Sequence, residues 1–444
     1  MFGNERPVMD YDAIVIGAGA AGLVAARELG RAGRRVAVLE ARDRAGGRIA
    51  GVADARALAP IEYGPEFVHG RPAVTYDLLH EYGATVVDNA DGSFLFVDGA
   101  LRAANDDPFE AAAGLLARAL ERDDDESVDA LLARVASDAA SHEAADWTRR
   151  LVAGFDAADP ARASARAVAL EWTGDASADG SQSRPLGGYG PLVAHLLATL
   201  DRSHVVLRFG IVAERIARAA SGVSVDARVR DGEAVTLRAK RVVVTVPIGV
   251  LQASGGATGS LAFDPPLPSA TRAAIEKIAM GPVVKVVLTF GTPFWEELAD
   301  GAWRDGAFFS GDGPFPTLWT QVPVRANTLV AWAGGPAAEA LAAGTDADRI
   351  ASALACAGRY FGDVRAAGGA FENGYLHDWQ RDPFARGAYS YVLVGGERAR
   401  ETLAQPVDGV LWFAGEACAS HGEGGTVAGA LESGLRAARE VLAR

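Results

Sequence analysis

Three glycines with the spacing G-x-G-x-x-G, at Gly17, Gly19 and Gly22, directly follow the apolar run at residues 11–17. The first glycine permits a tight turn, the second lets a pyrophosphate approach the backbone, and the third permits close packing of a helix on a strand. The helix that begins there offers N–H groups and the positive end of its dipole to the anion. Glu40 ends the next apolar run, where its carboxylate can accept hydrogen bonds from ribose hydroxyls. This arrangement predicts a dinucleotide site, and the acid disfavours NADP because it would repel a 2′-phosphate.

The segment after Glu40 adds groups that could meet a diphosphate, in the order Arg42, Gly46, Gly47 and Arg48. The glycines bring the backbone close to the ligand, and a guanidinium can neutralise phosphate charge. The alternative, that both arginines are ordinary surface charges, is disfavoured by their spacing. The segment resembles the G-G-R extension of FAD-binding oxidases of the glutathione-reductase-like superfamily, and this resemblance implies FAD as the cofactor.

A second glycine-rich turn lies near the C-terminus. The apolar run at residues 409–414 leads to Gly415 and Glu416, and a helix is expected from about Thr426 onward. The N-terminus of such a helix can stabilise negative charge that develops at N1 and O2 of a reduced flavin. The C-terminal segment therefore strengthens the prediction of a flavin site.

The chain as a whole resembles the flavin-dependent amine oxidase family, which includes monoamine oxidases, polyamine oxidases and the flavin-dependent lysine-specific histone demethylases. The resemblance covers nearly the whole chain, although residues 100–170 carry little of it. The run at residues 378–391 is close to the version found in demethylases and polyamine oxidases. Beside the glycine motifs, the matching segments are residues 64–70, 185–189, 244–247 and 263–268, Lys285, residues 379–391 and the C-terminal segment.

The resemblance implies a catalytic role for four residues. Lys285 stands where the family has a lysine that holds a water at flavin N5; the alternative is an outward-facing side chain on an alternating strand. Tyr389 matches one wall of the aromatic cage that orients the amine against the flavin; the alternative is a core tyrosine with a satisfied hydroxyl. Trp379 is expected to line the same cavity or to support it. Thr426 replaces the second cage tyrosine of monoamine oxidases.

Two departures from monoamine oxidases shape the expectation. Those enzymes attach FAD to a cysteine immediately before the cage tyrosine, whereas this chain has Ala388 there, which implies non-covalent FAD. The half-open cage at Thr426 is typical of polyamine-type or demethylase-type substrates. Histone demethylation is not expected, because the chain has no long helical insertion or chromatin-targeting module.

The positions expected to contact FAD are Gly17, Gly19, Ala20, Ala21, Gly22, Glu40, Ala41, Arg42, Gly46, Gly47, Arg48, Gly64, Pro65, Glu66, Val212, Ala213, Pro247, Gly415, Glu416, Gly425, Thr426, Val427 and Ala430. Glu62, Glu66 and His69 lie near the start of the family's substrate tunnel, and their roles are left open. His69 could meet a distal ammonium when neutral or through a hydrogen bond, or it could be structural. The histidines show no metal-binding spacing, and no H-E-x-x-H or G-x-S-x-G motif occurs.

The strand and helix patterns around these residues predict an α/β fold. Strand patterns occur at the start, in the middle and at the end of the chain, whereas residues 108–170 are helical in character. We expect a Rossmann-like FAD-binding domain of the glutathione-reductase type, built from discontinuous segments, and an α+β substrate domain. The predicted FAD-binding domain comprises residues 1–85, 190–276 and 381–444, and the predicted substrate domain comprises residues 86–189 and 277–380.

Composition narrows the class of protein. The 444 residues are 49% hydrophobic and 23% charged, the balance of an ordinary globular protein. The net charge of −14 makes nucleic acid an improbable partner, because nucleic-acid binding needs a basic surface. Two widely spaced cysteines, Cys356 and Cys418, exclude a disulfide framework. No apolar run is long enough for a membrane span, and the start of the sequence shows no secretory signal, so we expect a cytoplasmic protein. The sequence leaves open whether the protein forms a homodimer.

The predicted function is oxidation of a neutral amine by FAD, with a hydride equivalent moving from the α-carbon to flavin N5. The imine hydrolyses to an aldehyde or ketone, and O2 is reduced to H2O2. Polyamines or other alkylamines are the expected substrates, on the basis of Thr426 and the acidic charge. An amino-acid oxidase is ranked lower, because residues 300–335 offer only Arg304 and Arg325 for a carboxylate. A C–C desaturase of the same superfamily or a non-catalytic flavoprotein would also fit an FAD site; the presence of both Lys285 and Tyr389 argues against the non-catalytic protein.

Overall fold

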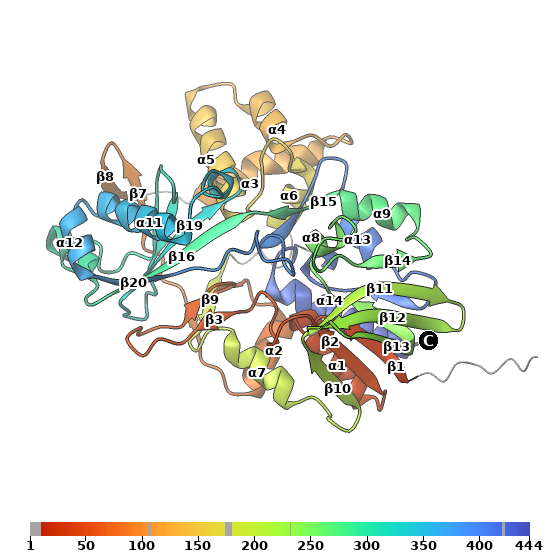
Figure 1. The fold of residues 1–444 in the computed structure, drawn as a ribbon. Coiled ribbons are helices and arrows are strands. Elements are labelled where there is room, and N and C mark those ends of the chain that lie inside the picture. The colour runs from red at the N-terminus through yellow and green to blue at the C-terminus, as the bar shows by residue number, and fades with distance from the viewer. Residues whose placement is uncertain (1–9, 105–107, 174–179, 231, 420–421) are drawn as a thin grey trace, which may run out of the picture.

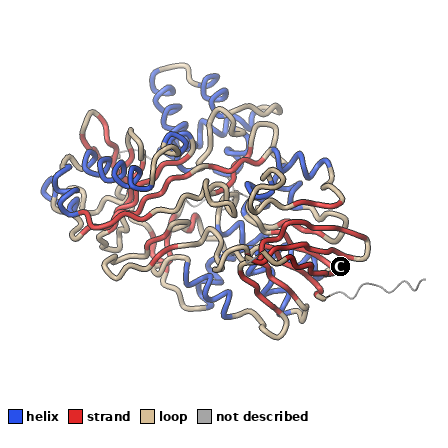
Figure 2. Tube along the Cα trace, viewed as in Figure 1, coloured by secondary structure: helices blue, strands red, loops and turns tan. Residues whose placement is uncertain are grey.

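The computed structural model describes residues 10–104, 108–173, 180–230, 232–419 and 422–444. Two large sheets and a cluster of helices make up most of it (Figure 1). Figure 2 shows the strands of the two large sheets in separate groups, with helices around each.

The first sheet has the order β10-β2-β1-β13-β12-β11-β14, and β22 also pairs with β13. Strands β10, β2, β1, β13 and β22 run parallel, and the antiparallel strands β11 and β12 extend this sheet. The parallel strands are nearly continuous apolar runs, as expected for a sheet covered on both faces. The bounds are β1 Tyr11–Ile16, β2 Val36–Glu40, β10 Val205–Phe209, β11 Ile211–Ala219, β12 Gly222–Val229, β13 Ala234–Val244, β14 Ala262–Asp264 and β22 Leu411–Phe413.

Helices α1 (Ala20–Arg31) and α14 (Val427–Leu442) pack against each other and share one hydrophobic core with β1 and β2. They come from opposite ends of the chain. Both helices begin on the side of the sheet where the parallel strands end, because each follows a strand of this sheet in the chain. The other helices near this sheet are α2 Ala73–Glu81, α7 Gly190–Ala198, α8 Ile248–Leu251, α9 Ser269–Glu276 and α13 Ala399–Ala404.

The second sheet has the order β20-β16-β19-β18-β17-β7-β8 and is antiparallel except for the β17–β7 pair. Helices α10, α11 and α12 cover it and share its core. The bounds are β7 Ser93–Val97, β8 Ala100–Ala103, β16 Val283–Phe290, β17 Phe308–Ser310, β18 Thr317–Trp319, β19 Thr328–Gly334, β20 Phe371–Tyr375, α10 Pro336–Ala340, α11 Asp346–Tyr360 and α12 Val364–Ala370.

A helical cluster lies beside the second sheet, at the top of Figure 1, and has its own apolar core. It comprises α3 Pro108–Ala117, α4 Val128–Val135, α5 Ala139–Phe155 and α6 Ala165–Trp172. The described residues also form three small sheets, with strands β3 Gly51–Val52, β4 Ile61–Glu62, β5 Val68–His69, β6 Val86–Asp88, β9 Gln182–Pro185, β15 Ile278–Gly281 and β21 Tyr389–Val392.

The predicted α/β class with a Rossmann-like sheet is confirmed. Every strand of the first sheet lies in a segment predicted for the FAD-binding domain, and every strand of the second sheet lies in a segment predicted for the substrate domain. Cys356 and Cys418 are both buried and unpaired. In the described part of the chain, no helix has the length and apolar character that crossing a bilayer requires.

Candidate active site

A cavity of about 530 Å³ lies between the two large sheets and the helical cluster. With one exception, all of the side chains and glycines predicted as site residues line it. The exception is Gly22, where a Cβ atom would lie 2.0 Å from the carbonyl oxygen of Gly17. Gly22 thus lies behind the residues that line the cavity. Its lack of a side chain lets α1 pack closely on the turn after β1.

The first turn of α1 faces one end of this cavity. Gly17 has a φ of +103°, which favours glycine, and the N-cap Gly19 supplies no side-chain hydrogen bond to the helix. The free N–H groups of this turn and the lining residues Ala20 and Ala21 therefore face a space suited to an anion. Glycine at these positions leaves that space open to a bound phosphate.

Glu40 is fixed at the end of β2 by two backbone donors. Its carboxylate oxygens accept hydrogen bonds from Ala18 N at 2.8 Å and from Arg42 N at 3.0 Å. The side chain is 4% exposed and lines the cavity. Each carboxylate oxygen retains a further lone pair, so the residue can still accept from ribose hydroxyls.

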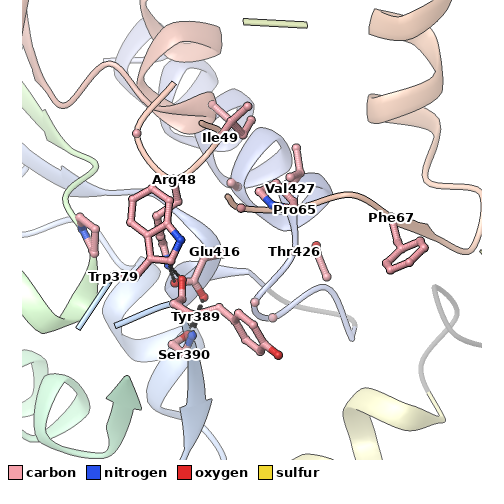
Figure 3. Close-up of a pocket in the computed structure, with 18 of the residues that line it drawn as sticks. Arg48, Ile49, Pro65, Phe67, Trp379, Tyr389, Ser390, Glu416, Thr426 and Val427 are labelled. Carbon is pink, nitrogen blue, oxygen red and sulfur yellow. Dashed lines mark hydrogen bonds and ion pairs between the residues drawn. The ribbon is translucent and has the colours of Figure 1, made fainter. Parts of the chain in front are cut away.

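The two arginines predicted to meet phosphate are already paired with carboxylates. Arg42 Nη2 lies 2.8 Å from Asp382 Oδ1, and Arg48 Nη1 lies 2.9 Å from Glu416 Oε1. Burial raises the pKa of Glu416, but the charges of Arg48 and Arg400 outweigh it and hold that pKa below its ordinary value. In Figure 3, Arg48 and Ser390 converge on Glu416. Because each arginine is paired with a carboxylate, this part of the cavity wall carries less net positive charge than two unpaired arginines would give it.

Thr426 is the N-cap of α14. Its Oγ1 accepts from Gly429 N at 2.9 Å and donates to Glu423 Oε2 at 2.8 Å. Because the Thr426 hydroxyl both donates and accepts a hydrogen bond within the protein, Thr426 forms part of the cavity wall but offers no free polar group to a ligand. Val427 and Ala430 line the same wall, so the positive end of a second helix faces the cavity.

These features fit FAD. One cavity is lined by an uncapped helix N-terminus, a carboxylate held at a strand end and a second helix N-terminus. They match, in order, what a diphosphate, a ribose and an electron-rich isoalloxazine require.

Lys285 belongs to strand β16 and is buried, with 4% of its surface exposed. All eight residues of β16 are buried, so the alternative of an outward-facing lysine on an alternating strand is wrong. Its Nζ donates to Gly64 O at 2.9 Å and lies 3.2 Å from Glu66 Oε1. One of its three N–H groups is used by the Gly64 carbonyl and the ammonium also pairs with Glu66, so an N–H group remains for a partner in the cavity.

Glu66 is held from the other side by Trp319, whose Nε1 donates to Glu66 Oε2 at 2.6 Å. Glu62 lies behind this group and does not line the cavity; it accepts from Tyr189 N at 2.9 Å. Burial raises the pKa of Glu62 to about 7, against the opposing charge of Lys285. The sequence left the roles of Glu62 and Glu66 open, and the structure places both carboxyls near Lys285.

Tyr389 forms an aromatic wall with a residue that the sequence did not identify. Its ring is stacked on Trp332, with centroids 6.5 Å apart and an interplanar angle of 19°. Tyr389 donates to Phe155 O at 2.5 Å, and Trp332 Nε1 donates to Gly154 O at 2.7 Å. Burial raises the pKa of the Tyr389 hydroxyl well above its ordinary value. The aromatic richness of residues 300–335 was the available signal for Trp332.

Trp379 is also in the lining, 3% exposed, and its Nε1 donates to Tyr63 O at 3.0 Å. In Figure 3 the hydroxyl end of Tyr389 points away from the Arg48–Glu416 pair, on the side where Thr426 and Phe67 lie. The wall near Tyr389 therefore faces a part of the cavity distinct from the nucleotide end.

The helical cluster supplies the remaining wall, although residues 100–170 carried little resemblance. Phe109, Trp147, Leu151, Phe155 and Asp156 line the cavity from α3, α5 and the turn after α5. The sequence marked this segment as helical but gave no motif that would assign side chains to a site.

Comparison with known proteins agrees with this geometry. The family model for flavin-containing amine oxidoreductases matches residues 20–442. Polyamine oxidase 4 of Oryza sativa is 29% identical over 97% of this chain and 88% of its own length. A lysine-specific histone demethylase 1 homologue of Arabidopsis thaliana is 33% identical, but over only 45% of this chain and 12% of its own length.

The fold matches that of putrescine oxidase in a structure with bound putrescine, with a TM-score of 0.80, 26% identity and coverage of 98% and 99% of the two chains. Family, fold and cavity thus agree in requiring a flavin and an amine. The chain belongs to the flavin-containing amine oxidoreductase family and is an FAD-dependent amine oxidase.

Proposed function

We propose that the chain oxidises a neutral alkylamine, polyamines included, in the part of the cavity walled by Tyr389, Trp332 and Lys285. The observation that carries this proposal is the buried Lys285 beside a stacked aromatic pair, in the same cavity as the dinucleotide cradle. Bound FAD supplies the redox chemistry, accepting a hydride equivalent from the amine α-carbon and passing two electrons to O2. The products are H2O2 and an imine, which hydrolyses to an aldehyde, or to a ketone when the α-carbon is branched.

The chain's own residues bind and orient the amine. The Tyr389 ring is fixed by its hydrogen bond to Phe155 O and by Trp332, so the amine meets a rigid apolar face. Such a face favours the neutral amine, because burial penalises the charged form. The free N–H of Lys285 can hold a water in this space, which is the role the family resemblance implies.

We propose that FAD is held without a covalent bond. Ala388, immediately before Tyr389, has no nucleophile, and its carbonyl accepts from Arg48 at 2.7 Å. Acid precipitation should therefore leave all of the flavin in the supernatant. Yellow colour that stays in the protein pellet would contradict this.

The substrate class is supported by two observations. Polyamine oxidase and putrescine oxidase, by their names, act on alkylamines, and both align along nearly the whole chain. Arg304 and Arg325, which the sequence offered for an amino-acid carboxylate, do not line the cavity. Arg325 instead pairs with Glu296 and Asp305. These arginines therefore give no support to an amino-acid oxidase.

The test is an anaerobic visible spectrum of the holoenzyme mixed with diamines, triamines, monoamines and amino acids. Bleaching of the flavin band by amines and not by amino acids is expected. Replacement of Lys285 by Met should slow turnover by about 100-fold or more, as for loss of a group that holds or moves a proton. Lys277→Met is the matched control, because Lys277 is exposed and bonds a loop carbonyl. A flavin that no amine bleaches would refute the proposal.

A further inference from the structure

Arg400 lies behind the cavity wall, in α13, and is 6% exposed. It does not line the cavity itself, but its guanidinium contacts residues that do. Its Nε donates to Glu171 Oε1 at 3.0 Å, its Nη1 donates to Ser390 Oγ at 2.7 Å and its Nη2 donates to Ser390 O at 2.9 Å. Arg400 thus joins α6, which carries Glu171, to β21, which carries Ser390 and Tyr389.

Ser390 extends this contact toward the nucleotide end of the cavity. Because its Oγ accepts from Arg400, the hydroxyl proton can be donated to Glu416 Oε2, which lies 2.6 Å away. Glu416 Oε1 in turn accepts from Arg48 at 2.9 Å, and Arg400 Nη1 also donates to the Glu416 carbonyl at 3.3 Å. The side chains of Glu171, Arg400, Glu416 and Arg48, here called the ion-pair series, therefore alternate in charge from the helical cluster to the cofactor end.

The ion-pair series has two cations and two carboxylates, so its net charge is zero. The charges of Arg48 and Arg400 hold the pKa of Glu416 below its ordinary value, although burial acts in the opposite direction. Asp156 adds no charge beside Glu171, because burial and the Glu171 charge raise its pKa well above the ordinary value. Removal of one member of such a buried series leaves another charge uncompensated.

The Arg400–Glu171 pair also supports the turn before α14. A Cβ atom at Gly424 would lie 2.6 Å from Glu171 Oε1 and 2.7 Å from Arg400 Nη2, so the backbone of this turn packs directly on the pair. Thr426, two residues later, is the N-cap of α14. Arg400 therefore contacts both the turn that leads to the second helix N-terminus and the carboxylate that holds Arg48.

We propose that Arg400 is a positioning residue for the FAD site: by pairing with Glu171 and Glu416 at once, it balances both carboxylates and fixes Glu416 for Arg48. It thereby keeps uncompensated negative charge away from the flavin. Reduced flavin carries more negative charge than oxidised flavin, so an unbalanced carboxylate in this wall would oppose reduction. This role concerns the cofactor and holds for any amine that the cavity takes.

The midpoint potential of the bound flavin tests this role. In Arg400→Met the two carboxylates of the series share Arg48 alone. At about pH 8.5, above the range in which carboxyl groups ordinarily titrate, flavin reduction should become about 10-fold less favourable, a fall of about 30 mV for a two-electron couple. Arg400→Lys keeps the charge and should keep most of the potential. Arg398→Met is the matched control, because the Arg398 side chain is exposed and pairs with Glu401 at the surface.

Charge compensation separates this role from a purely structural one. Glu171→Gln removes one carboxylate with little change of shape, so by itself it should raise the potential. Combined with Arg400→Met, it returns the series to zero net charge and should bring the reduction equilibrium to within about 3-fold of the wild type. Loss of packing alone predicts no such recovery, because the second substitution fills none of the space that Arg400 leaves.

Retention of flavin by the holoenzyme during dialysis is a second readout. Arg400→Met should release flavin about 10-fold faster, because the uncompensated carboxylate repels the diphosphate, and the double variant should regain retention.

A wild-type potential in Arg400→Met, or a lowered potential that Glu171→Gln does not restore, would refute the role of Arg400. If Arg400→Met does not fold, Glu171→Gln alone decides, and an unchanged potential there overturns the proposal. The flavin is reduced chemically and no amine is present, so these results are independent of whether the proposed function holds.

Discussion

At the residue scale, the site depends on buried charges that compensate one another. Lys285, Glu66 and Glu62 bring one ammonium and two carboxyls into the interior, where an uncompensated charge is costly. The raised pKa of Glu62 means that this carboxyl takes up a proton near neutrality. The group then holds one ammonium, one carboxylate and one neutral acid, which is its balanced state.

Glu62 should make stability depend on pH. Its pKa is about 7 when folded and 4.5 ordinarily, so between these values the folded state binds more protons than the unfolded state. The free energy of unfolding contributed by Glu62 therefore falls as pH rises through this window. Glu62→Gln removes this dependence. The free energy of unfolding of the variant, minus that of the wild type, should therefore rise by about 3 kcal/mol as pH rises from 4.5 to 7.

Denaturant unfolding of both proteins across this pH range measures the difference. Glu276→Gln, at an exposed glutamate, is the control and should track the wild type. A Glu62→Gln curve parallel to that of the wild type would show that Glu62 does not titrate in this window.

At the element scale, two helix N-termini face the cavity, and the glycine pattern predicted the turn and the helix that form the first of them. This part of the fold could be predicted because it depends on local geometry: the φ of Gly17 and the contact of Gly22 follow from a strand, a turn and a helix in direct succession. Trp332 could not be predicted in this way. It lies opposite Lys285 only through the β16–β19 register, which pairs residues distant in sequence. The same holds for Phe155 and Asp156, whose positions depend on how the helical cluster packs.

Replacement of Gly22 by Ala tests the first element. A Cβ there would lie 2.0 Å from Gly17 O, and this atom belongs to the backbone, so the turn or the helix must move. We expect loss of stability of about 2 kcal/mol, as for overpacking, and protein purified largely without flavin. The ratio of flavin to protein absorbance measures the second effect. Gly114→Ala, in α3 with open space around its Cβ position, is the control.

At the scale of the whole molecule, the cavity is bounded by both large sheets and by the helical cluster. A ligand that fills such a space binds the folded state and not the unfolded one, so it stabilises the whole chain by mass action. Removing FAD should therefore lower Tm, and adding FAD back should restore it in a concentration-dependent manner. The stabilisation should be about 4 kcal/mol when free FAD exceeds its Kd about 1,000-fold. A Tm that is equal with and without FAD would contradict this.

The packing of α14 against α1 also bears on how the protein is made. The first strands and α1 emerge from the ribosome long before β22 and α14, which complete the same sheet and the same hydrophobic core. During synthesis the apolar face of α1 lacks its α14 partner until residues 427–442 have been translated. A nascent chain stalled before residue 427 would lack the second helix N-terminus that faces the cavity, so we expect it to bind flavin weakly.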